Sequence, residues 1–190
     1  MAYRNGTYIA FHAAGSTDPT ASDIKYYRML KAWHEHDDIE FEFTNSHDKV
    51  AGVRDSSSRD TLRRSLTERL NRSKNMVLIV GATTRFDIDW VPFEIGYAVD
   101  RCKIPIIVTY TGGFNWILNP AQLNSLWPAA LASRINNSTV RAIHIPFKQR
   151  VIDCAIRQFD HDRLPATPLN YYTAEAHRSL GIDVPALYNP

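Results

Sequence analysis

Residues 75–102 read NMVLIVGATTRFDIDWVPFEIGYAVDRC, and this stretch decides the fold of the 190-residue chain. It begins with an unbroken apolar run at 76–80, which has the length of a strand and no alternation, as is typical of a strand buried on both faces of a parallel sheet. After a polar loop at 85–89, apolar residues recur at helical spacing: Val91, Ile95, Ala98, Val99 and Cys102. A buried strand followed by such a helix predicts an α/β fold.

The helix in this stretch is predicted to begin at Asp89, a suitable N-cap, with Pro92 in the first turn, where its missing N–H removes no intrahelical bond. Glu94 lies on the flank of the apolar face, on one stripe with Trp90 and Tyr97. A carboxylate there lies where open α/β sheets bind ligands. The helix dipole predicts an ionised Glu94 at neutral pH, and the flanking position predicts a fold that tolerates substitution. The alternative is a solvated residue that only complements the dipole.

Composition excludes several classes of function. The net charge of +2 is spread along the chain and forms no basic patch for nucleic acid. The two cysteines, Cys102 and Cys154, fall in predicted helices, so we expect no disulfide and a reducing compartment. No apolar run has membrane-spanning length, and the N-terminus lacks the apolar core of a signal peptide. We therefore expect a cytoplasmic protein without membrane or nucleic-acid partners.

The other elements alternate along the chain in the same way. Strands are predicted at 7–11, 39–43, 104–110 and 140–146, and helices at 22–35, 59–74 and 149–159. Strand–helix alternation implies right-handed crossovers and a doubly wound, mostly parallel, flavodoxin-like sheet of five strands in the order 2-1-3-4-5. The strictly alternating strand at 39–43 belongs at a sheet edge.

The C-terminal half is more irregular. The segment 111–138 carries repeated Gly, Pro and Asn, and we expect a long loop with one or two short helices there. We expect residues 1–160 to form one α/β domain. Residues 161–190 are then a C-terminal extension that packs on the domain as an extended arm, with a helical turn near 174–180.

A candidate site follows from the strand order, because the loops after the first and second strands meet the helix that carries Glu94 at one carboxyl edge. We predict Glu94 as the catalytic residue. The aromatic and polar residues that we expect to bind the ligand around it are Phe11, His12, His47, Asp48, Arg54 and Trp90. The alternative for Phe11 and Trp90 is that they are simply core residues.

Familiar cofactor and metal motifs are missing from the sequence. No Walker loop or G-x-G-x-x-G follows a strand, and no Cys/His set has zinc spacing, so we predict no metal and no bound cofactor. Ordinary glycoside hydrolysis needs two carboxylates, so a lone Glu94 is too little for it. One carboxylate suffices when the leaving group departs unaided, as does the cationic nicotinamide of NAD.

The segment Trp90-Val91-Pro92-Phe93-Glu94-Ile95 resembles the W-V-x-x-E-[IL] segment of TIR domains. Over about residues 3–159 the chain resembles the TIR-like ThsB family of Thoeris antiphage defence. The supporting segments are Tyr8–His12, Asp23–Arg28, Phe43–Asp48 and Arg54–Ser58. The resemblance implies a flavodoxin-like fold, a catalytic Glu94, and NAD as a substrate that is converted into a signalling nucleotide. That nucleotide would activate a partner effector protein, and association with copies of the same chain is a further expectation.

Three functions remain open at this point. The first is an NAD-consuming enzyme that makes an ADP-ribose-derived signal. The second is a non-catalytic TIR-like module that assembles through exposed loops. The third is a nucleoside deoxyribosyltransferase-like enzyme, in which the single Glu would act as the nucleophile.

Overall fold

The computed structural model describes residues 4–13, 23–35, 43–44 and 56–185. The strands are β1 (Gly6–Ala10), β2 (Phe43–Thr44), β3 (Ser73–Val80), β4 (Ile106–Tyr110), β5 (Ala142–Pro146) and β6 (Asn170–Tyr171). The helices are α1 (Ile24–Glu35), α2 (Ser56–Asn71), α3 (Trp90–Gly96), α4 (Ala129–Asn136), α5 (Gln149–Gln158) and α6 (Ala174–Ser179). A π-helix at Tyr97–Cys102 continues α3, and short 3-10 helices lie at Thr84–Phe86 and Pro120–Leu126.

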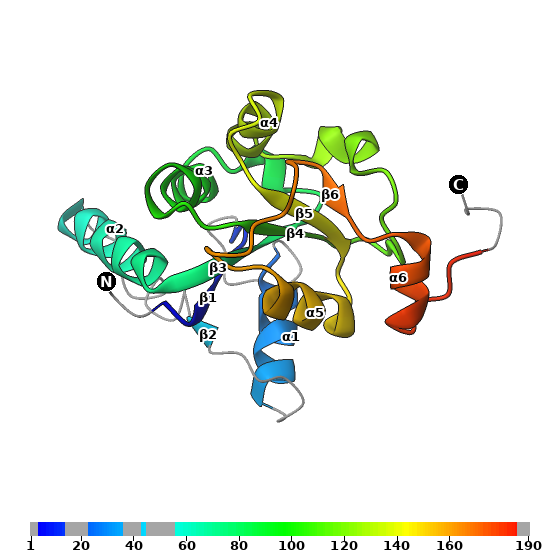
Figure 1. Ribbon diagram of the computed structural model, residues 1–190. Coiled ribbons are helices and arrows are strands. Elements are labelled where there is room, and N and C mark those ends of the chain that lie inside the picture. The colour runs from blue at the N-terminus through cyan, green and yellow to red at the C-terminus, as the bar shows by residue number, and fades with distance from the viewer. Residues whose placement is uncertain (1–3, 14–22, 36–42, 45–55, 186–190) are drawn as a thin grey trace.

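All strand pairs are parallel, and the order is β2-β1-β3-β4-β5-β6 (Figure 1). The predicted flavodoxin-like order 2-1-3-4-5 is therefore confirmed, with β6 added beside β5. β3 lies between β1 and β4, where Met76 is aligned with Tyr8 on one side and Ile106 on the other. The apolar run at 76–80 is thus the centre of the sheet, as its lack of alternation predicted.

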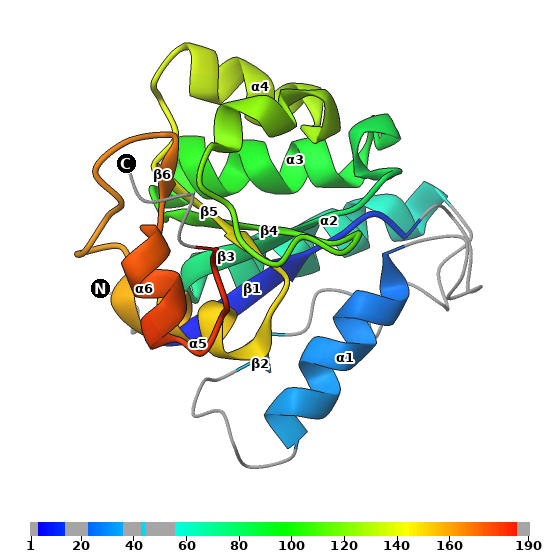
Figure 2. The same ribbon diagram turned by 90° about the vertical axis from the view of Figure 1, so that its right-hand side faces the viewer.

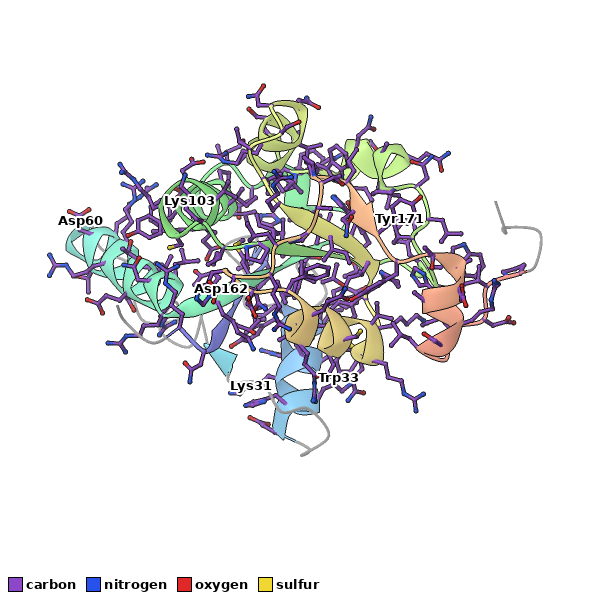
Figure 3. The ribbon with its side chains drawn as sticks, viewed as in Figure 1. Lys31, Trp33, Asp60, Lys103, Asp162 and Tyr171 are labelled. Atoms are coloured by element: carbon purple, nitrogen blue, oxygen red, sulfur yellow. The ribbon has the colours of Figure 1, made fainter. Side chains whose placement is uncertain are left out.

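Helices cover both faces of the sheet (Figures 1 and 2). Alternate strand residues point to opposite faces, so β1 sends Tyr8 and Ala10 into one core cluster and Ile9 into the other. The first cluster lies under α2, α3 and α4, and the second lies under α1 and α5. Side chains fill both layers in Figure 3, where Trp33 projects from α1; its ring centroid lies 5.4 Å from that of Phe147.

Some element boundaries differ from the prediction. The helix predicted at 59–74 runs from Ser56 to Asn71, and β3 begins at Ser73, because pairing with Gly6 of β1 extends the strand before its apolar run. Of the strand predicted at 39–43, residues 39–42 lie outside the described residues. Position 43 begins β2, which lies at the sheet edge as predicted.

The C-terminal part of the chain is more regular than the prediction of an extended arm. Residues 170–171 form β6, which pairs with β5, and α6 confirms the helical turn predicted near 174–180. Ala176, Leu180 and Ile182 pack against the second core cluster. The division of the chain at residue 160 stays a prediction. Among the helices in the described ranges, none has the length and apolar character needed to cross a bilayer.

Candidate functional site

The site begins where the loop after β3 turns into α3. The side-chain Oδ1 of Asp87 accepts hydrogen bonds from the backbone N–H groups of Asp89, Trp90 and Val91, at 2.9, 3.0 and 3.4 Å. Asp89 occupies the N-cap position but makes no capping bond, and its carboxylate instead pairs with Arg59 at 2.5 Å. The expectation that Asp89 caps the helix is therefore corrected, because Asp87 lies closer to the free amides.

Glu94 points into the protein. Its exposed fraction is 0%, and its Oε1 accepts a hydrogen bond of 2.5 Å from the hydroxyl of Tyr8 on β1. Its Oε2 is buried and has no hydrogen-bond partner within the described part of the chain. The alternative of a solvated residue that only complements the helix dipole is therefore wrong.

The charge state of Glu94 follows from this burial. The pKa of the Glu94 carboxyl is raised to about 8, chiefly by loss of solvent; the Tyr8 hydrogen bond lowers it in part, and the negative charge of Asp87 adds to the rise. At neutral pH the free protein therefore holds Glu94 mostly protonated. The expectation of an ionised carboxylate is wrong, because desolvation outweighs the helix dipole.

The flank of α3 is covered by its neighbour α2 and by its own aromatic rings. The guanidinium of Arg59 lies 5.6 Å from the ring centroid of Trp90, and that of Arg63 lies 4.8 Å from the centroid of Phe93. Both rings also pack against the first core cluster. Trp90 is partly buried on the same face of the sheet as Glu94, so the structure brings these two predicted residues to one layer.

Phe11 lies in the other layer. It is 1% exposed, belongs to the second core cluster and stacks on Tyr27 of α1 with ring centroids 4.8 Å apart. The structure does not bring Phe11 together with Glu94, since Tyr8, which contacts Glu94, faces the opposite side of the sheet. The expectation that Phe11 and Glu94 line one cleft is therefore wrong.

His12 remains at the carboxyl edge of β1, half-buried, with its Nδ1 3.3 Å from the Thr83 hydroxyl. This contact joins the loops that follow β1 and β3. Predicted ligand-binding residues His47, Asp48 and Arg54 lie outside the described residues. The ligand-binding roles assigned to His12 and Trp90 stay predictions.

A buried polar cluster between β1 and β3 escaped the sequence analysis. The Thr84 hydroxyl donates to Asp23 Oδ2 at 2.6 Å and accepts from the Gly81 N–H at 2.7 Å. Burial raises the pKa of Asp23, while Thr84, His12, Lys25 and Gly81 lower it. A Cβ at Gly81 would lie 2.0 Å from Asp23 Oδ1, so only glycine allows this approach. The sequence signal was the polar Gly81–Thr84 turn directly after a buried strand, at the switch point where such sheets bind ligands.

A second buried network ties the C-terminal extension to the sheet. The Tyr110 hydroxyl accepts from Trp127 Nε1 at 2.7 Å and donates to His144 Nδ1 at 2.7 Å. His144 Nε2 then carries the proton and donates to the Pro168 carbonyl at 3.0 Å. Burial lowers the pKa of His144 to about 4, so the imidazole is neutral. This network is structural and lies on β4 and β5.

Within the described ranges, side chains of the types that bind metal ions come together at one place. Oxygen and nitrogen atoms of Asp160, His161 and Asp162 lie within 4.8 Å of one another. Asp160 is engaged by the Arg163 guanidinium and by the backbone N–H of residues 162 and 163. The Arg163 guanidinium therefore already pairs with the Asp160 carboxylate in this surface turn.

The chemistry available at the start of α3 is that of one buried carboxyl. It is held by a tyrosine, has one oxygen without a partner among the described residues, and has a pKa raised to about 8. Such a perturbed group after a central strand is a functional-site candidate. A family model described as "Thoeris protein ThsB, TIR-like domain" matches residues 8–114, a span that contains Tyr8, Asp23, Thr84 and Glu94.

Proposed function

Since the chain belongs to the family of Thoeris ThsB TIR-like domains, we propose that it cleaves the nicotinamide–ribose bond of NAD. Membership of this family associates the chain with Thoeris antiphage defence. In the proposed role, the cleavage makes an ADP-ribose-derived nucleotide in the cytoplasm, and this nucleotide activates a partner effector protein. NAD is the substrate, and the reaction uses no further cofactor.

The observation that carries the proposal is the burial of Glu94 without a cationic partner in the described ranges. Burial of this kind disfavours the ionised form of the carboxyl, and a positively charged substrate beside it offsets that penalty. The nicotinamide ring of NAD is a cationic pyridinium. Its approach lowers the pKa of Glu94, so substrate binding itself produces the ionised carboxylate.

The ionised carboxylate then assists bond cleavage. As nicotinamide leaves, positive charge moves from the pyridinium ring onto the ribose, and an anion beside the anomeric carbon stabilises that transition state more than the ground state. The departing nicotinamide is neutral and needs no general acid. The oxocarbenium ion left on the ribose is then captured by water or by a hydroxyl group of the nucleotide itself, and the attacking oxygen loses its proton to solvent. Because Glu94 is fully buried, the side chains around it must move to admit the ribose.

The test is nicotinamide release by the purified protein and by Glu94→Gln, with the products resolved by mass. Replacement of the carboxyl should lower turnover by a factor of about 100 to 1,000. Glu68→Gln, at an exposed position of α2, is the matched control and should cleave NAD like wild type. Each protein is assayed alone and with lysate of phage-infected cells, so that a required trigger is present. Unchanged cleavage by a folded Glu94→Gln would refute the proposed mechanism.

A second candidate is a non-catalytic assembly module, and one surface favours it. Ile88 is 92% exposed and Phe86 is 62% exposed, both in the loop that leads into α3. Large apolar side chains exposed close together in one loop are a feature of interaction sites. If NAD stays intact in both assay conditions, while sedimentation shows self-association that Ile88→Ser abolishes, the assembly function replaces the enzymatic one.

A further inference from the structure

Two arginines of α2 lie over the start of α3. The Arg59 guanidinium donates to Asp89 Oδ1 at 2.5 Å and lies 5.6 Å from the ring centroid of Trp90. Arg63 lies one turn further along α2, with its guanidinium 4.8 Å from the ring centroid of Phe93. Figure 1 shows α2 beside α3. Positions four residues apart share one face of a helix, so the two guanidinium groups form a single basic patch along α3.

Both guanidinium groups keep donors for a further partner. The Arg59 side chain is 59% exposed and that of Asp89 is 43% exposed, so their ion pair contributes little to stability and a stronger anion can replace it. Arg63 forms no ion pair within the described ranges. A guanidinium that stacks on a ring keeps its N–H groups in its own plane, so the rings do not block these donors.

The spacing between this patch and Glu94 suits a dinucleotide. Trp90, on which Arg59 stacks, precedes Glu94 by one helical turn, a rise of about 6 Å. In NAD one ribose separates the anomeric carbon from the diphosphate, which is a span of the same order. Towards the other end of α3 the two helices are joined, because the Tyr97 hydroxyl contacts Asn71 at 3.4 Å. A ribose that reaches Glu94 therefore brings its diphosphate to the start of α3.

The patch has the chemistry that a diphosphate needs. Each guanidinium presents a planar fork of N–H donors that matches the oxygens of a phosphate group, and a diphosphate offers two such groups. The Asp89 carboxylate already occupies the fork of Arg59, in the manner of a substrate phosphate. The other carboxylate of this loop, Asp87, is engaged by three backbone N–H groups.

We propose that Arg59 and Arg63 bind the diphosphate of the dinucleotide substrate, and that Asp89 holds Arg59 until the substrate replaces it. This inference rests on the proposed cleavage of NAD and assigns the substrate's central group to α2. A nucleoside without phosphate cannot displace Asp89. The arginine pair therefore selects dinucleotides over nucleosides.

The test is calorimetric titration of the full chain with ADP-ribose, which contains the diphosphate and lacks nicotinamide, so the proposed cleavage cannot consume it. Arg59→Gln should weaken binding roughly 10- to 100-fold, and Arg63→Gln should weaken it in the same direction. Asp89→Asn should tighten binding by about 1.5- to 5-fold, because the competing ion pair is gone. Loss of structure would weaken binding in every variant, so opposite shifts at the two ends of one ion pair identify the exchange.

Arg64→Gln is the matched control. Arg64 is exposed and adjoins Arg63 on α2 but lies about a quarter turn away around the helix, so this variant should bind ADP-ribose like wild type. Thermal unfolding checks that each variant is folded, and Asp89→Asn keeps the test decisive if Arg59→Gln fails to fold. Absence of ADP-ribose binding at millimolar concentration overturns the proposal. Equal weakening by Arg59→Gln and Arg64→Gln also overturns it, since the attraction is then general to the basic surface.

The nicotinamide-release assay separates this inference from the proposed function. Arg59→Gln should lower kcat/KM for NAD by the same factor as it weakens ADP-ribose binding. If wild type leaves NAD intact while ADP-ribose binding shows the predicted shifts, the diphosphate site stands and the proposed cleavage is wrong. If Arg59→Gln cleaves NAD like wild type, the cleavage stands and the diphosphate site is wrong.

Discussion

Replacing Glu94 with glutamine should remove a large pH dependence of stability. The unfolded carboxyl titrates near 4.5 and the folded one near 8, so the folded state binds the extra proton between these values. The contribution of Glu94 to stability is therefore complete below pH 4.5 and is lost as pH rises towards 8. Each pH unit above 4.5 lowers the free energy of unfolding by about 1.4 kcal/mol, and the total loss reaches about 3 kcal/mol at pH 7.

The assay is urea unfolding of wild type and Glu94→Gln between pH 4.5 and 8. The glutamine side chain carries no charge and still accepts the Tyr8 hydrogen bond through its carbonyl oxygen. The unfolding free energy of the variant minus that of wild type should therefore rise by about 3 kcal/mol from pH 4.5 to pH 7. Other titrating groups, such as His144, contribute the same pH dependence to both proteins, so their contributions cancel in this difference. Glu68→Gln, an exposed control, should show no such trend. Parallel curves for wild type and Glu94→Gln would mean that Glu94 titrates in water, contrary to the structure.

Three further outcomes follow from the same contacts. If the ionised Glu94 performs the cleavage, kcat/KM for NAD should rise with pH and level off above about 8, measured by nicotinamide release. Tyr8→Phe removes the hydrogen bond that lowers the Glu94 pKa, so the rising limb of that profile should move to higher pH. Tyr110→Phe leaves Trp127 Nε1–H and His144 Nδ1 buried without their partner, and urea unfolding should show a loss of about 2 to 4 kcal/mol.

Much of the fold could be predicted from local patterns. The run at 76–80 has no polar position and has the length of a strand, so it predicted a strand covered on both faces, and β3 is the centre of the sheet. The start of α3 was predictable from its spacing and from Pro92 in the first turn. These features depend on backbone geometry and on the period of apolar residues, which are both local to the sequence.

The environment of Glu94 was decided by the tertiary structure alone. Tyr8 lies 86 residues away in the sequence and reaches Glu94 only because β1 pairs with β3 beneath α3. Helical periodicity puts Glu94 on a flank, but whether a flank meets water depends on the neighbouring helix, and here α2 lies beside it. Burial then sets the pKa, since desolvation is a property of the surroundings and not of the residue.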